Sequence, residues 1–513
     1  MTFFESLILL LLVAIILLQI ARRLKLPYPA MLAGAGVVVA LIPGSPNIFL
    51  SPETALALFI APVLVDSAFD YPLIEARRFW APLVSLVIFA VLITTGVVAW
   101  VGVVSVGLPL AAAIALGAIV SPPDAAAATA VLTALSIPRS TETVIKGESL
   151  FNDASALLIY TAAVSIQVNG GLTPAVDLQL ALAIPGGILF GILCAFLVRW
   201  INRLVVDTLG GNILQFVLAY LVWIGADRLH LSAILCTIAF AMTLAQSSET
   251  HMSARMRVHS YAVWSAVVFT LNVLAFLLMG MQSRNIISRM DPARLREALT
   301  AALLVISAVI VTRVIVLVAF NRIMVWHRRR RGLDGGGTIR QAIFVGWCGM
   351  RGFVTLATAF ALPERFPQRD LIVLIAFSVV LATLVVQGLT LAPLIRLLKL
   401  NDGLTPKREL TAARAALAAA ALQSLNGKEG EEVDRLRYGF SIKRGAASDS
   451  AKCQSLEQYR SLGLAAVSAE REALERLRTD DRVGIEMYLL LQEELDWSEL
   501  TLLPEGDRRI VET

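Results

Sequence analysis

Two carboxylates, a hydroxyl and an amide lie within one short stretch of the sequence, Glu148-Ser-Leu-Phe-Asn-Asp. If the stretch is helical, residues four apart share a face, so Ser149 and Asp153 present a hydroxyl and a carboxylate together. Glu148 and Asn152 then share the adjacent face. Oxygen ligands of this kind suit a hard ion such as Na⁺, and nothing in the stretch suits a transition metal. The spacing therefore predicts that Asp153 and Ser149 bind a cation, or that Asp153 binds a proton.

Three further ionisable residues interrupt apolar stretches: Asp124, Arg313 and Arg351. Such a side chain near the centre of a bilayer costs several kcal/mol unless it is paired or hydrated. With Glu148 and Asp153, three acids face two bases, so one carboxylate is left to exchange its counter-ion. We expect Glu148 to pair with Arg313 and Asp153 to be the exchanging group. The alternative is that both acids make structural ion pairs.

Two of these charges lie beside sequences that break helices. Ser121-Pro-Pro-Asp124 places consecutive prolines inside an apolar stretch, where they remove helix hydrogen bonds and clash with the preceding turn. Gly346-Trp-Cys-Gly-Met-Arg-Gly352 is glycine-rich and favours a second break, although close helix packing is another explanation for its glycines. Irregular backbone at membrane depth must be buried in protein or line a wet cavity, where its carbonyl groups can coordinate a cation.

The composition indicates a protein that lies mostly in a lipid bilayer. Apolar residues make up 57% of the 513 residues and charged residues 16%, whereas soluble chains carry about 25% charged residues. The four histidines lie near the ends of apolar stretches, which argues against a histidine-built metal site or a Ser-His hydrolase. No segment resembles a Thr-Val-Gly-Tyr-Gly filter, which argues against a channel. We expect no enzyme activity, no cofactor and no nucleic acid partner.

Apolar runs long enough to cross a bilayer recur along the first 400 residues. They predict thirteen spans, at 4–20, 27–43, 52–72, 79–105, 109–135, 144–168, 177–205, 210–227, 231–248, 259–282, 297–326, 339–362 and 369–396. Loops after odd-numbered spans hold about three times as many arginines and lysines as loops after even-numbered ones, which places the N-terminus outside and the C-terminus in the cytoplasm. Beyond residue 400, helical patterns occur at 406–424, 454–479 and 480–498, with a loose linker over 427–450.

The two breaks fall in spans 5 and 12, which are corresponding positions if spans 1–6 and 8–13 form inverted halves joined by span 7. We therefore expect an all-α integral membrane protein of about 13 transmembrane helices, with inverted repeats and two broken crossing helices. A transmembrane domain over 1–400 is followed by a cytosolic helical tail over 401–513. Paired interruptions of this kind are typical of transporter sites.

These motifs resemble those of the monovalent cation/proton antiporters of the sodium/proton exchanger superfamily, over about residues 5–400. Glu148-Ser-Leu-Phe-Asn-Asp is similar to the family's Glu-Ser-Leu-x-Asn-Asp signature, and Gly349-Met-Arg-Gly is similar to its Gly-Leu-Arg-Gly. Arg313 falls where the family places a buried arginine. In the Asp124 segment the prolines precede the aspartate, whereas in the family motif a proline follows it.

The resemblance implies a role for each of these residues. It implies an ion and proton site that comprises Asp153, Ser149, Asn152, the backbone carbonyls near Ser121, Pro122 and Pro123, and the acid Asp66 late in the third span. Glu148 and Arg313 would form a structural ion pair, and Asp124 and Arg351 would compensate the dipoles of the half-helices. For Asp66, the alternative is a structural acid at a helix end.

The resemblance also implies a mechanism in which a transport core, here spans 4–6 and 11–13, moves against a dimer-forming scaffold, here spans 1–3 and 7–10. The Asn-Asp form is similar to the electroneutral branch, which exchanges one cation for one proton. We therefore expect a homodimeric antiporter in the cell (inner) membrane that exchanges Na⁺ for H⁺ in pH and salt homeostasis. A K⁺ or Li⁺ exchanger, a cation channel and a carrier for an organic solute are the alternatives.

Overall fold

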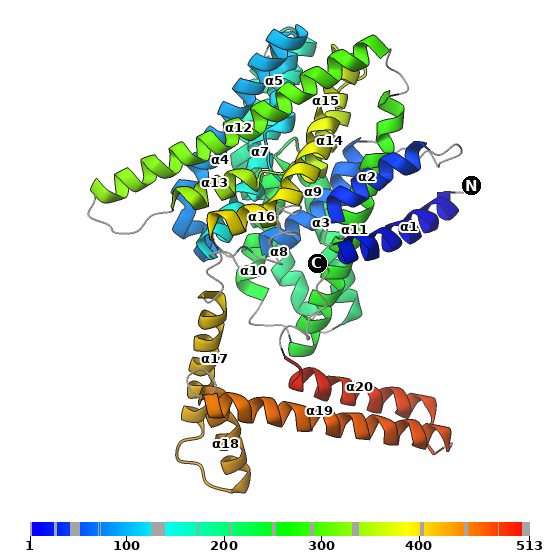
Figure 1. Ribbon diagram of the computed structural model, residues 1–513, viewed down its shortest axis with the longest axis vertical. Helices are drawn as coiled ribbons and strands as arrows, with labels where there is room; N and C mark the ends of the chain where they lie inside the picture. The colour runs from blue at the N-terminus through cyan, green and yellow to red at the C-terminus, as the bar shows by residue number, and fades with distance from the viewer. Residues whose placement is uncertain are drawn as a thin grey trace. The chain divides into compact units, whose positions relative to one another are not determined.

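The computed structural model describes residues 3–24, 28–41, 52–69, 71, 73–124, 139–171, 174–205, 208–248, 253–287, 292–330, 338–400, 405–445, 450–480 and 482–504. All regular structure among these residues is helical (Figure 1). The chain forms two compact units, Met1–Asn401 and Asp402–Thr513. The expectation of an all-α architecture is therefore confirmed for the described chain.

The first unit holds the apolar helices. They are α1 (Phe3–Leu24), α2 (Tyr28–Leu41), α3 (Pro52–Phe69), α4 (Leu73–Val106), α5 (Leu110–Val120), α7 (Arg139–Asn169), α8 (Pro174–Val205), α9 (Leu209–Arg228), α10 (Ala233–Ser248), α11 (Ala254–Ile287), α12 (Pro292–Arg330), α13 (Ile339–Trp347), α14 (Phe353–Phe360), α15 (Arg369–Ala382), the π-helix η1 (Thr383–Gln387) and α16 (Gly388–Leu398). Each predicted span overlaps at least one of these helices.

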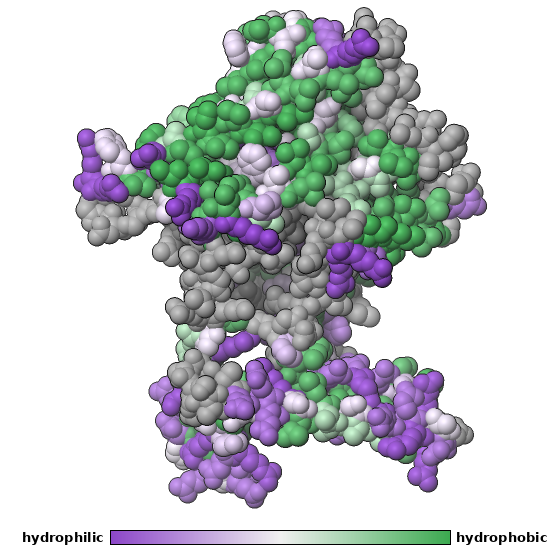
Figure 2. Space-filling view, in the orientation of Figure 1, coloured by the Kyte–Doolittle hydropathy of each residue, from purple (hydrophilic) through white to green (hydrophobic). Residues whose placement is uncertain are grey.

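Length and apolar composition qualify six helical stretches of the described chain to cross a membrane. The longest is Leu295–His327 in α12. Its outward side chains are large and apolar, and in Figure 2 a hydrophobic surface follows this helix to a hydrophilic end. An apolar surface of this extent is stable against lipid and would aggregate in water. The protein is therefore a multi-pass membrane protein, while the count of thirteen crossings and the inverted repeat stay predictions.

Both expected interruptions fall in helices that pack around the centre of the unit. Helix α5 ends at Val120, and the chain over Ser121–Asp124 is not helical. The rest of the predicted fifth span lies outside the described residues. The second interruption separates α13 from α14 over residues 348–352, as the glycine-rich sequence predicts. No pattern in the sequence predicts the π-helix η1, which interrupts the last predicted span.

Two groups of helices surround these breaks. Helix α5 packs between α4 and α7, and α12 packs on α4, so these four lie together in Figure 1. Helix α3 packs with α9 and α10, and α2 packs with α11. The last pair touches through backbone, because a Cβ atom on Gly36 would lie 2.8 Å from the Cα atom of Gly280. Such close contacts hold helices together in membranes through dispersion forces.

The second unit consists of α17 (Thr405–Ser424), α18 (Glu431–Gly445), α19 (Ser450–Thr479) and α20 (Ile485–Leu502). Helices α19 and α20 form a hairpin, in which Arg471 pairs with Asp496 at 2.7 Å and with Glu499. The expectation of a loose linker over 427–450 was wrong, because α18 occupies most of it. Acidic residues begin α18 and basic residues end it, an arrangement that stabilises the helix dipole.

Candidate ion-binding site

Asp153 lies in the middle of α7 and is only 8% exposed. Its carboxylate makes no hydrogen bond or ion pair with any residue in the described part of the chain. Ser149, one turn earlier on the same face of α7, is 6% exposed. A buried carboxylate without a fixed partner is costly when ionised, so it must be protonated or bind a cation.

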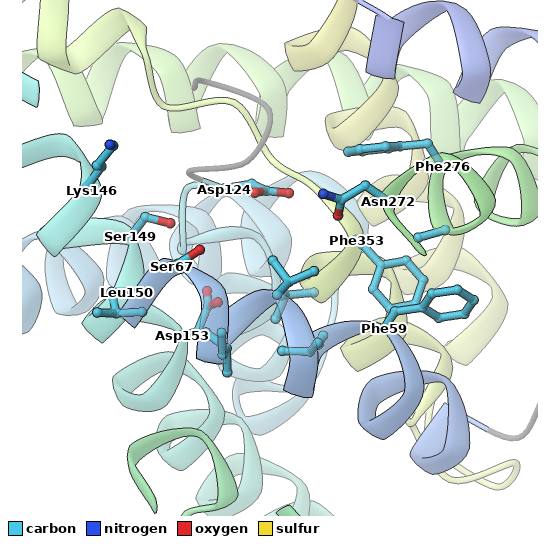
Figure 3. Close-up of a pocket in the computed structure, with 15 residues that line it drawn as sticks. Phe59, Ser67, Asp124, Lys146, Ser149, Leu150, Asp153, Asn272, Phe276 and Phe353 are labelled. Carbon is cyan, nitrogen blue, oxygen red and sulfur yellow. The ribbon is translucent and has the colours of Figure 1, made fainter. Parts of the chain in front are cut away.

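The hydroxyl of Ser149 donates a hydrogen bond of 2.9 Å to the backbone carbonyl oxygen of Pro123. This contact joins α7 to the non-helical segment that follows α5. Two successive prolines supply no backbone N–H groups, so this segment cannot continue the hydrogen bonding of α5. The structure therefore brings the predicted hydroxyl and one predicted carbonyl together beside Asp153, as Figure 3 shows for Ser149 and Asp153.

Arg351 lies in the break between α13 and α14 and is fully buried. Its Nε donates to the carbonyl oxygen of Val120 at 2.9 Å, and its Nη2 donates to that of Ser121 at 3.3 Å. Its Nη1 also contacts the carbonyl oxygen of Gly349. These carbonyls include the C-terminal end of α5, where the helix dipole is negative. The guanidinium therefore lies at the C-terminal end of a half-helix, while its role in compensating the helix dipole stays a prediction.

Asp124 faces the other half-helix. Its backbone N–H donates to the carbonyl oxygen of Met350 at 2.7 Å, so the two broken helices touch at their breaks. Its carboxylate lies against Gly352, where any added Cβ atom would collide with Oδ2. Gly352 directly precedes α14, and a carboxylate is favourable near the positive N-terminal end of a helix. Only glycine at this position lets the carboxylate approach so closely.

Glu148 and Arg313 form a buried ion pair between α7 and α12. Two parallel hydrogen bonds, of 2.9 and 3.1 Å, join the carboxylate to the guanidinium. Glu148 is fully buried and Arg313 is 4% exposed. Asn152 donates from Nδ2 to Oε1 of Glu148 at 3.2 Å. A bidentate pair with an additional donor is the geometry that best offsets the cost of burying both charges.

Two cavities meet at Asp153. The larger has a volume of about 60 Å³, and its polar lining includes Ser67, Asp124, Lys146 and Asn272 (Figure 3). The smaller has a volume of about 20 Å³ and is lined mainly by apolar side chains that include Trp223. Both Asp153 and Val354 line the two cavities. The carboxylate of Asp153 therefore lines both cavities, and most of the other polar side chains belong to the larger one.

A family model for the transmembrane sodium/hydrogen exchanger matches residues 8–397, a range that contains all the residues of this site. The chain belongs to the sodium/hydrogen exchanger family. An uncharacterized Na⁺/H⁺ exchanger of Mycobacterium tuberculosis is 27% identical over 95% of this chain and 94% of its own length. A low-affinity Na⁺/H⁺ antiporter of Synechocystis, NhaS1, is 28% identical over 82% of this chain and 80% of its own length.

A third relative of this exchanger is a sodium, potassium, lithium and rubidium/H⁺ antiporter of Bacillus subtilis, 28% identical over 71% of this chain and 57% of its own length. Among solved structures, the fold is similar to that of the sodium proton antiporter MjNhaP1 from Methanocaldococcus jannaschii. The TM-score is 0.59 at 17% identity, over 76% of this chain and 100% of that one. At this identity the likeness is one of fold.

Some predicted site residues of the exchanger lie away from the cavities. Asn152 lines neither cavity in the described structure, and its amide serves Glu148 instead. Asp66 is half-buried on α3, but its neighbour Ser67 is the residue that lines the larger cavity. Pro122 lines the smaller cavity, and the carbonyl of Ser121 already accepts from Arg351. Glu148 and Asn152 are four residues apart and share one face of α7, which explains why Asn152 faces Glu148 and lines neither cavity.

Sequence reasoning missed three polar residues of the larger cavity: Ser67, Lys146 and Asn272. Lys146 precedes Asp153 by seven residues, which is two helical turns, so the two residues share a face of α7. This spacing could have identified Lys146 as a neighbour of the site. Asn272 is an amide inside the apolar stretch Met256–Leu278, and a polar group at that depth was also a signal. Ser67 carries no signal of its own, because serine is common in helices of every kind.

Replacing Arg313 by methionine should leave Glu148 buried without its counter-charge and lower the stability of the exchanger by about 3–5 kcal/mol. The double variant Glu148→Gln, Arg313→Met should recover most of this loss, since it buries no net charge. The midpoint of thermal unfolding in detergent measures both effects. Asp370→Asn is the control, because Asp370 is 53% exposed and lies 3.9 Å from its partner Arg369. Equal midpoints for the single and double variants would contradict the pairing.

Proposed function

We propose that this exchanger is a secondary active antiporter that exchanges a monovalent cation, first of all Na⁺, for H⁺ by alternating access. The observation that carries the proposal is the buried Asp153, which has no partner among the described residues and lines both cavities. The relatives from Synechocystis and Bacillus subtilis, named for Na⁺/H⁺ and for sodium, potassium, lithium and rubidium/H⁺ antiport, support the same chemistry. K⁺/H⁺ exchange is the second candidate, favoured by the breadth of ions in the Bacillus name.

In this proposal, proton and cation compete for one carboxylate. A proton neutralises Asp153 directly, while a cation neutralises it with Ser149 and the Pro123 carbonyl as neighbouring oxygen ligands. Because neither can bind while the other is present, each conformational change carries one or the other. The adjacent Asn152 bears no charge, so one cation exchanges for one proton and the cycle is electroneutral.

The moving part is proposed to comprise α4, α5, α7 and α12–α16, and the scaffold α1–α3 and α8–α11. The strongest polar contacts support this division, because Glu148–Arg313 and the contacts of Arg351 all lie within the first group. The facing wall of the larger cavity comes from α3 and α11 of the second group. Between the groups lie apolar contacts such as Phe59 on Phe353, with ring centroids 5.0 Å apart. Helices that touch through apolar contacts of this kind can move past one another without leaving charges unpaired.

We further propose that the protein lies in the cell (inner) membrane, with its N-terminus outside and its C-terminus in the cytoplasm, and serves pH and salt homeostasis. The larger cavity then opens to the cytoplasm, because it reaches Ser67 near the end of α3 and Lys146 near the start of α7. A homodimer formed through the scaffold is part of the same proposal, and light scattering in detergent measures it.

Asp153→Asn should abolish cation-driven proton movement in proteoliposomes, because an amide can neither bind a proton at this site nor balance a cation. A pH-sensitive dye inside the vesicles reports exchange after pulses of Na⁺, K⁺ or Li⁺, and the same series ranks the ions. Asp370→Asn, which makes the same chemical change at an exposed carboxylate, should retain exchange. Exchange by Asp153→Asn at the control rate would exclude the proposed site.

A cysteine at Ser67 should react with a membrane-impermeant maleimide in inside-out vesicles and stay protected in intact cells. The native Cys194, Cys236, Cys348 and Cys453 are first replaced by serine. Leu229→Cys is the control for the opposite side, since Leu229 follows α9 at a predicted outer loop and is 56% exposed. Labelling of Ser67→Cys from outside alone would reverse the proposed orientation.

A further inference from the structure

Asn272 is a polar residue of the larger cavity to which neither the sequence nor the proposed mechanism gives a role. It lies near the middle of α11, inside the apolar stretch Met256–Leu278. A carboxamide at this depth costs free energy unless hydrogen bonds or a ligand compensate it. Its amide makes no hydrogen bond with any residue that the structure describes. A compensating partner must therefore come from the cavity that it lines.

The side chain of Asn272 points into this cavity. In Figure 3, its amide and the carboxylate of Asp124 point toward one another, with Ser149 and Asp153 further along the same lining. A cation that enters the cavity thus meets a wall with carboxylates on one side and an amide on the other. Carbonyl oxygens of amides are regular ligands of hard cations, and they add no charge that would compete for protons.

The wall that carries Asn272 packs on a helix other than the one that carries Asp153. Helix α11 is held against α2 by the backbone contact between Gly36 and Gly280, and Gly280 is two turns beyond Asn272. The side chain of Phe276, one turn from Asn272, is 2% exposed and lines the same cavity. In the proposed mechanism the amide therefore belongs to the scaffold, whereas Asp153 lies on α7 of the moving part.

We propose that the carboxamide oxygen of Asn272 binds the monovalent cation as it passes between the larger cavity and Asp153, either directly or through one water molecule. This ligand from α11 sets the apparent affinity for the cation and the preference among cations. It takes no part in proton binding, because a carboxamide does not titrate. The inference rests on the proposed function and specifies which further residue of the site selects its substrate.

The test compares Asn272→Leu, Asn272→Gln and Asn272→Asp with the wild-type protein in proteoliposomes, with Na⁺, K⁺ and Li⁺ as the probes. Asn272→Leu should raise KM for Na⁺ by about five- to tenfold, the effect of one lost polar contact, at a nearly unchanged maximal rate. Asn272→Gln should restore part of the affinity, and Asn272→Asp should lower KM because it adds a negative charge. The ranking of the three cations should change in Asn272→Leu.

Thr270→Val is the matched control on the same helix. Thr270 is exposed and its hydroxyl donates to the carbonyl oxygen of Ala266 at 2.8 Å, so its loss should leave KM unchanged. Equal KM values for Asn272→Leu and Thr270→Val would overturn the inference, as would a lower maximal rate with unchanged KM and ion ranking. If Asn272→Leu does not fold, unchanged KM values in Asn272→Gln and Asn272→Asp overturn it. Each of these results would contradict only the role of Asn272 and would not affect the assignment of Asp153. Exchange by Asp153→Asn at the control rate would instead contradict the proposed function.

Discussion

An ionised carboxylate inside an apolar bundle costs several kcal/mol unless a counter-charge or a ligand compensates it. Helix α7 meets this constraint in two ways within six residues. Glu148 has a fixed bidentate partner in Arg313, and both groups are buried. Asp153 has no hydrogen bond or ion pair within the described chain and lines two cavities. The first carboxylate joins two helices, and in the proposed mechanism the second obtains its counter-charge from solution.

The breaks in the crossing helices depend on the same constraint. Ending α5 at Val120 leaves carbonyl groups in a buried place, and the guanidinium of Arg351 satisfies those of Val120 and Ser121. The backbone N–H of Arg351 in turn donates to Thr383 at 3.1 Å, at the start of the π-helix η1. Arg351 thus forms hydrogen bonds that connect the end of α5, the break between α13 and α14, and the π-helix η1. This arrangement satisfies the carbonyl groups that the end of α5 frees, as irregular backbone at membrane depth requires.

Much of the site follows from spacing along one helix or from charges that need partners. The stretch from Glu148 to Asp153 fixes which side chains share a face, and Arg313 requires an acid wherever it is buried. The glycines around Arg351 indicate the second break, although the π-helix behind it leaves no pattern in the sequence. The opposite wall of the cavity could not be predicted in the same way. Ser67 and Asn272 reach it only through the packing of α3 and α11, which depends on contacts between distant segments.

In the proposed mechanism, one cation and one proton compete for Asp153. The number of protons released when Na⁺ binds to the purified protein tests it most directly. A pH-indicator dye measures this number in weak buffer, at a pH where the cation-free site is protonated. We expect one proton to be released for each Na⁺ bound to the wild-type protein and none to be released from Asp153→Asn. Equal proton release from both proteins would contradict it.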